Sequence, residues 1–117
     1  MISLKALQGT WKCLWFETNG VKQEKSITDA RLVIQDDQWN WANSWKCKLV
    51  IDQATVPTII DLEEDGRPYE GICRLRGDKL TFCWNLTPED GRKRPAAFTT
   101  KDGDGCQVVV FERERKK

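Results

Sequence analysis

Apolar and polar residues alternate along most of this chain, in short runs separated by turn residues. The clearest alternation covers residues 39–51, where the odd-numbered positions are mostly apolar and the even-numbered positions mostly polar. A period of two is typical of a β-strand with one buried face. Asn43 and Ser44 could break this run into a hairpin, and such a break would leave the apolar face unchanged.

Similar runs recur along the chain, and residues of the turn-forming types Gly, Pro, Asn and Asp lie between them. The clearest predicted hairpin joins residues 69–76 to residues 79–86 through the turn dipeptide Gly77-Asp78. The other predicted strands are residues 7–16, 31–35, 58–62, 96–100 and 106–113.

Helical periodicity is almost absent. No segment of helical length places apolar residues at i, i+3, i+4 and i+7 behind a capping residue. The best candidate for one short helix is residues 23–30, with Ser26 or Thr28 as its cap. About eight or nine short strands with so little helix predict an all-β protein, a small antiparallel up-and-down barrel. We expect residues 1–117 to form this single domain, with residues 114–117 as a charged tail.

The amino-acid composition restricts the kinds of partner that the chain is expected to bind. The chain has 19 basic and 18 acidic residues, a net charge of +1, and therefore no electrostatic footprint for nucleic acid or an anionic membrane. Its first residues lack the apolar stretch of a signal peptide, and no apolar run approaches the roughly 20 residues of a membrane helix. We expect a cytoplasmic protein that binds neither nucleic acid nor a membrane.

The chain contains no histidine. This excludes His-dependent catalytic triads and His-ligated zinc, non-haem iron or haem. An enzyme based on carboxylates, lysine or cysteine remains open, yet no such residues are arranged for catalysis, so we expect no catalytic residues, no metal and no cofactor. Five cysteines lack any C-x-x-C pair and are expected to be free, inert thiols; they are Cys13, Cys47, Cys73, Cys83 and Cys106.

Two charged stretches are weaker candidates for a site. Residues 92–94 are Arg-Lys-Arg and could bind phosphate, but acidic neighbours and the near-zero net charge favour solvated charge. An acidic stretch could do acid–base chemistry or bind Ca²⁺. It lacks the spacing of a calcium loop, which favours an exposed loop; its members are Asp61, Glu63, Glu64 and Asp65.

Several short motifs carry a resemblance to a known family. Gly9-Thr10-Trp11 resembles the Gly-x-Trp motif that opens the first strand of lipocalin-type barrels, and Ile60-Asp61-Leu62, Gly77-Asp78-Lys79-Leu80 and Gly103-Asp104-Gly105 follow in matching order. Over residues 7–113 the chain resembles an uncharacterised lipocalin-like family that is abundant in planctomycete bacteria. The resemblance implies a fold and no established biochemical activity. The chain departs from the family in its short, Trp-rich region 39–45 and at Cys73, where an aromatic residue is common.

The lipocalin-like opening motif also predicts how one end of the barrel is closed. We expect the Trp11 indole to close that end, with Arg113, or alternatively Arg115, packed over its face. Gly9 would supply the conformational freedom that the chain needs as it enters the first strand.

The Trp-rich stripe is the main candidate for a binding site. In a closed barrel one face of every strand points inward, so Trp39, Trp41 and Trp45 should line the interior together with Leu80, Phe82 and Trp84. These side chains could form a pocket for a small apolar or aromatic ligand. They could instead fill the barrel completely, and filling is favoured because a bulky aromatic face is ordinary core.

The last predicted strand is apolar on both faces, with Val108 and Val110 on one side and Val109 and Phe111 on the other. An apolar outer wall needs a cover, either a local helix near residues 22–30 or another chain. Three functions therefore remain open. They are a module that binds a small apolar ligand, an interaction domain that docks a protein partner or a second copy, and, with less support, a His-free enzyme.

Overall fold

Nine strands form one antiparallel sheet in the computed structural model, which describes residues 3–18, 20–23, 31–42, 45–52, 58–64, 66–85, 94–95, 97–98, 100 and 106–114. One short 3₁₀ turn, η1 (Lys5–Leu7), precedes the sheet. Within these residues the strands are β1 (Gly9–Thr18), β2 (Val21–Gln23), β3 (Arg31–Gln35), β4 (Gln38–Trp41), β5 (Trp45–Asp52), β6 (Thr58–Glu64), β7 (Arg67–Arg76), β8 (Lys79–Asn85) and β9 (Cys106–Arg113).

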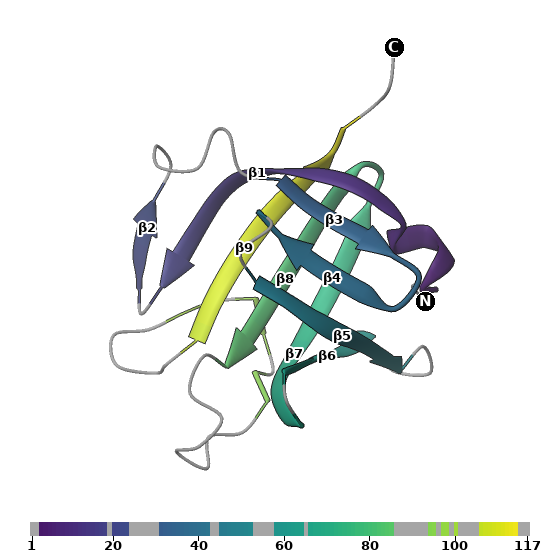
Figure 1. The fold of residues 1–117 in the computed structure, drawn as a ribbon. Coiled ribbons are helices and arrows are strands. Elements are labelled where there is room, and N and C mark those ends of the chain that lie inside the picture. Colours follow the sequence, from purple (N-terminus) through teal and green to yellow (C-terminus); the bar gives the residue numbers. More distant parts are fainter. Residues whose placement is uncertain are drawn as a thin grey trace.

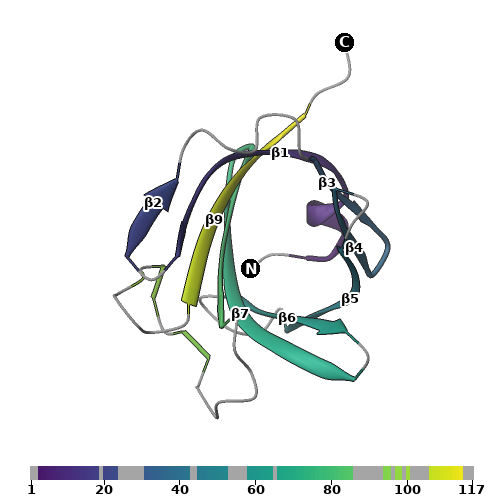
Figure 2. The same ribbon diagram turned by 60° about the vertical axis from the view of Figure 1, so that its left-hand side comes forward.

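The sheet closes on itself through β1. One edge of β1 pairs with β3 over residues 9–12, and the other pairs with β9 over residues 11–18. Eight strands, β1 and β3 to β9, therefore form a closed barrel, and β2 lies outside it, beside the C-terminal end of β1 (Figure 1). Figure 2 looks into this ring of strands. The predicted all-β antiparallel barrel is confirmed.

A β-bulge in β1 reverses which side chains face inward. Before it, Trp11 and Cys13 belong to the interior core; after it, Phe16 packs against that core, and Trp15 packs on the outside. The register shift lies between Cys13 and Trp15, because one extra residue opposes the same stretch of β9. A strict period of two would have placed Trp15 inside.

The Trp-rich run is a hairpin, as one of the two sequence interpretations allowed. Strands β4 and β5 pair with Trp39 opposite Cys47 and Trp41 opposite Trp45, which keeps all four side chains on one face. Strands β7 and β8 form the predicted hairpin, with Cys73 opposite Phe82. The strands predicted at 31–35 and 106–113 have the observed bounds of β3 and β9.

Other predicted elements were wrong or lie outside the described residues. Leu7 belongs to the 3₁₀ turn, so the first strand begins two residues later than predicted and runs on to Thr18. No strand includes the described residues of the segment predicted at 96–100, because Ala97 and Phe98 form a bend. The helix predicted at 23–30 falls mostly on undescribed residues, and Gln23 itself is in β2.

The apolar outer wall of β9 is covered by the chain itself. Outside the barrel, Val108 packs with Ile72 and Cys83, and three partly buried residues pack over them: Trp15, Phe98 and Cys106. The Arg74 guanidinium lies 4.5 Å from the centre of the Phe98 ring. The expected cover was a helix near 22–30 or another chain, but Phe98, from the segment between β8 and β9, contributes to it.

Candidate functional site

One end of the barrel is closed by Trp11 and Arg113, as the lipocalin-like motif predicted. The Arg113 guanidinium lies 4.3 Å from the Trp11 ring centre, while the Trp11 indole N–H donates to the carbonyl of Leu7 at 3.0 Å. Arg113 also donates to the carbonyls of Ala6 and Gln8, both at 2.7 Å. The guanidinium thus ties the 3₁₀ turn across the barrel end; Arg115, the alternative, lies outside the described residues.

Gly9 makes this closure sterically possible. Its φ angle is +129°, which side-chain-bearing residues rarely adopt, and a Cβ at this position would lie 3.3 Å from Nη1 of Arg113. The predicted role of Gly9 in the entry to the first strand therefore agrees with the geometry.

The six predicted interior residues all lie in or against one core cluster. Strands β4 and β8 face each other across the barrel, so Trp39 meets Phe82 at 4.9 Å and Trp84 at 5.5 Å between ring centres, both nearly edge to face. Leu80 lies nearer the closed end, opposite Leu75 and Phe111. The middle of the barrel is therefore packed with rings. This agrees with the interpretation that aromatic side chains fill the interior, as far as the middle of the barrel is concerned.

The opposite end of the barrel has an outer layer of aromatic rings. Trp45 contacts Tyr69 at 5.5 Å and an interplanar angle of 87°, and it contacts Trp84 at 6.3 Å. Trp41 stands against Phe111 at 5.6 Å. Trp41, Trp45 and Tyr69 point inward yet are partly exposed, whereas the rings beneath them are buried. Solvent therefore reaches inward-facing aromatic side chains at this open end.

Sequence reasoning missed two aromatic members of this interior, Tyr69 and Phe111. Tyr69 shares the inward face of β7 with Gly71 and Cys73, and alternation along the predicted hairpin would have revealed it. Gly71 matters because it lies opposite Trp84 and a Cβ there would be 3.0 Å from the Trp84 Cβ. Phe111 was left undecided because both faces of its strand are apolar.

Two indole N–H groups in this interior lack a hydrogen-bond acceptor. Trp39 is 1% exposed and Trp84 is 5% exposed. Within the part of the chain that the structure describes, neither Nε1 atom has a hydrogen-bond partner. Most buried side-chain polar atoms do have one, so this pair of donors is unusual.

Three of the cysteine thiols are poor nucleophiles because their pKa values are raised. Burial raises the pKa of Cys13 to about 11 and that of Cys73 to about 12. Burial also raises the pKa of Cys47 to about 12, helped by the negative charge of Glu64 on the neighbouring strand. These three groups are thiols, not thiolates, at neutral pH.

All five cysteines are free in the structure, and they are expected to be free in solution. Cys73 and Cys83 lie on opposite faces of the sheet, which prevents them from pairing. Alkylation of the denatured, unreduced protein, counted by mass spectrometry, should add five labels, and a count of three or fewer would contradict this. In the native protein at pH 8, Cys13 and Cys73 should react slowly, since roughly one in a thousand or fewer of these thiols is ionised.

Arg94 and Asp61, one from each charged stretch, contact each other in the structure. Arg94 donates to the Asp61 carboxylate at 2.5 Å and to the Gly71 carbonyl at 2.8 Å, and it forms an ion pair with Glu70 at 3.2 Å. The interpretation of Arg94 as solvated charge was therefore wrong. Asp61, Glu63 and Glu64 belong to strand β6 and not to an exposed loop, and Arg94 pairs with Asp61 on the barrel wall. Arg92, Lys93 and Asp65 lie outside the described residues.

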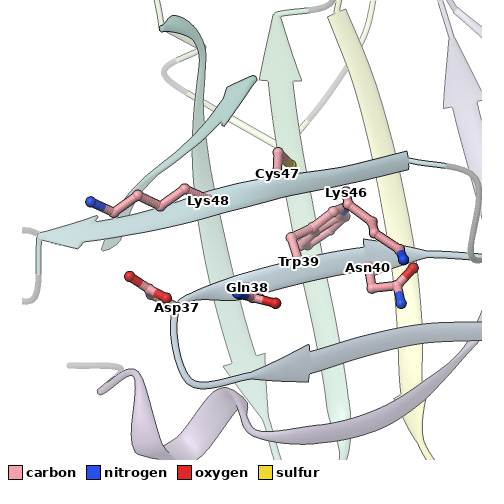
Figure 3. A pocket seen from close by; sticks show the side chains of 7 residues that line it. All are labelled: Asp37, Gln38, Trp39, Asn40, Lys46, Cys47 and Lys48. Carbon is pink, nitrogen blue, oxygen red and sulfur yellow. The ribbon is translucent and has the colours of Figure 1, made fainter. Parts of the chain in front are cut away.

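A shallow hollow of about 580 Å³ lies on the β4–β5 hairpin (Figure 3). Its lining alternates between outward polar side chains and strand positions whose side chains belong to the core. The lining residues are Asp37, Gln38, Trp39, Asn40, Lys46, Cys47 and Lys48. Among the described residues no group of three or more His, Cys, Asp or Glu side chains could hold a metal ion. The described part of the chain also contains no helix long and apolar enough to cross a membrane.

Comparisons with known proteins found no match to this chain. No protein-family model, curated protein or solved structure matches this chain. The eight-stranded antiparallel barrel is compatible with a lipocalin-like fold.

Proposed function

We propose that this protein is a non-catalytic binding module that holds a small, flat and largely apolar ligand at the open end of its barrel. The observation that carries the proposal is the partial exposure of three inward-facing rings, Trp41, Trp45 and Tyr69, above a buried aromatic core. The finer assignment to the lipocalin-like family of planctomycete bacteria is part of the same proposal and rests on the motifs that begin at Gly9-Thr10-Trp11.

The two ends of the barrel differ in a way that favours this location. Arg113 and the 3₁₀ turn seal one end with hydrogen bonds, and the rings around Trp39 fill the middle. A ligand of appreciable size would therefore contact the outer ring layer, where Trp45 and Tyr69 stand nearly perpendicular to each other. Ligand sites are typically concave and lined by aromatic side chains with few polar groups.

The absence of catalysis is also part of the proposal. The chain has no histidine to act as a general base. Cys47 faces the interior near the open end, but its raised pKa of about 12 keeps it protonated and weakly nucleophilic at neutral pH. Binding is then the simplest use of this interior.

Titration with naphthalene, followed by tryptophan emission, tests the proposal. We expect saturable quenching, with about ten-fold weaker binding in Trp45→Ala because one stacking ring is lost. Lys46→Ala is the matched control, since this exposed neighbour lies on the same strand and points outward. A signal that does not saturate up to the solubility limit of naphthalene would overturn the proposal.

Docking of a protein partner or a second copy through the outer surface has less support. The apolar outer face around Val108 is already covered by Phe98 and its neighbours. The large apolar side chains that remain exposed in the described residues, Val21, Val33 and Val50, lie on three different strands. Isolated exposed apolar residues are normal on monomeric proteins and do not indicate an interface.

A further inference from the structure

We infer that the barrel recognises a neutral hydrogen-bond acceptor, such as a ketone or amide oxygen, through the indole N–H groups of Trp39 and Trp84. This inference rests on the proposed function and specifies the chemistry of its ligand. Its basis is the pair of buried donors that have no acceptor within the described part of the chain.

The two donors belong to neighbouring rings. The rings of Trp39 and Trp84 are in contact, at 5.5 Å between centres and nearly perpendicular. Both rings also contact Trp45, at 6.4 Å and 6.3 Å, and Trp45 is one of the three partly exposed rings of the open end. A ligand that displaces the Trp45 ring would therefore contact both indole rings.

Indole chemistry defines what the site would accept. The indole Nε1–H only donates, so it requires an acceptor and cannot serve a second donor. A buried donor without a partner is costly, and a ligand that supplies the acceptor recovers that loss. A hydrocarbon ligand of the same shape would leave both donors unpaired.

The electrostatic surroundings favour a neutral acceptor over a carboxylate. Glu64 lies close enough to Cys47, an interior side chain of the same end, for its negative charge to act on that thiol. The guanidinium of Arg113 lies at the closed end, where it is held by Trp11 and the 3₁₀ turn. A carboxylate would also lose its hydration beside two side chains that are 1% and 5% exposed, which costs far more for a charged group than for a neutral oxygen.

The experiment compares two ligands of matched shape on the intact protein, 2-acetylnaphthalene and 2-isopropenylnaphthalene, by equilibrium dialysis. They differ in a carbonyl oxygen that replaces a methylene group. We expect the ketone to bind about ten-fold more tightly, although water solvates it better, because it satisfies a buried donor.

Variants of Trp39 and Trp84 test whether their indole N–H groups cause the preference for the ketone. Trp39→Phe and Trp84→Phe each keep an aromatic ring and remove the N–H, so each should reduce the ketone preference, and the double variant should abolish it. Trp45→Phe is the matched control; it should weaken both ligands and leave their affinity ratio unchanged. The ratio of the two ligand affinities can be measured on the unmodified protein even if a variant fails to fold.

The outcomes separate this inference from the proposed function. Equal binding of the two ligands to the unmodified protein would overturn the inference and leave the binding module intact. A ketone preference that survives in the double variant would also overturn it, because the acceptor would then be bound elsewhere. Failure of both ligands to bind would overturn the inference and count against the proposed function as well.

Discussion

Replacing Trp39 with alanine should lower the free energy of unfolding by about 3–5 kcal/mol, the usual range for large-to-small aromatic changes in a core. The ring is 1% exposed and lies in the middle of the barrel, in edge contact with Phe82 and Trp84. Truncation would remove these contacts and leave a cavity that the rigid β-strands cannot close. Urea denaturation followed by circular dichroism would measure the loss.

Val33→Ala is the control for this substitution. Val33 points outward from the neighbouring strand β3 and is 36% exposed. Its truncation should cost less than about 1 kcal/mol, since surface changes of this kind are small. A loss for Trp39→Ala no greater than that of Val33→Ala would contradict the packed interior described above.

Arg113→Ala should lower the free energy of unfolding by about 2–4 kcal/mol, because it removes charge-assisted hydrogen bonds and a cation–π contact together. The guanidinium donates to two backbone carbonyls, those of Ala6 and Gln8, and covers the Trp11 ring. These bonds link the 3₁₀ turn and Gln8 to strand β9. The measurement is again urea denaturation, with protection of the 3₁₀ turn amides followed by hydrogen exchange.

Two further variants serve as controls for this prediction. Arg113→Lys should recover only a small part of the loss, because one ammonium group cannot reproduce the planar fork of a guanidinium. Arg76→Ala, an exposed position on strand β7, should have little effect. If Arg113→Ala were no more destabilising than Arg76→Ala, the closure of this barrel end would not depend on Arg113.

The predictions that succeeded depended on patterns that are local along the chain. Alternation placed Trp39, Trp41 and Trp45 on one face whether or not a turn interrupted the run, because a hairpin preserves that face. Two-residue turn chemistry fixed the pairing of β7 with β8, and with it the opposite orientations of Cys73 and Cys83. Strand bounds were accurate where turn residues flanked a continuous apolar run, as for β3 and β9.

The predictions that failed depended on contacts between distant segments. A bulge between Cys13 and Trp15 turned Trp15 outward, and only the pairing of β1 with β9 defines that shift. Arg94 was taken for a solvated charge because its partners, Asp61 and Glu70, lie far from it in sequence. Phe98 was assigned to a strand, but its ring is needed to cover the outer face of Ile72 and Val108.

The candidate site divides in the same way. Inward orientation of the six predicted residues followed from alternation alone, whereas the contact of Arg113 with Trp11 followed from the resemblance of the opening motif to lipocalin-type barrels. The packing of Trp39 against Phe82 and Trp84, the partial exposure of Trp45 and Tyr69, and the unpaired indole donors could not be predicted. They depend on how rings from β4, β5, β7 and β8 fit together across the barrel.

The sequence by itself determined an all-β antiparallel barrel, the faces that residues 39–51 and the 69–86 hairpin turn inward, and the absence of histidine chemistry. It did so because side-chain alternation, turn residues and composition act over a few neighbouring positions. Only the tertiary structure decided that the middle of the barrel is filled, that one end is sealed and the other lined by partly exposed rings, and that the apolar outer wall is covered from within the chain. These features are set by side-chain volume and hydrogen bonding between residues far apart in sequence, which no local pattern encodes.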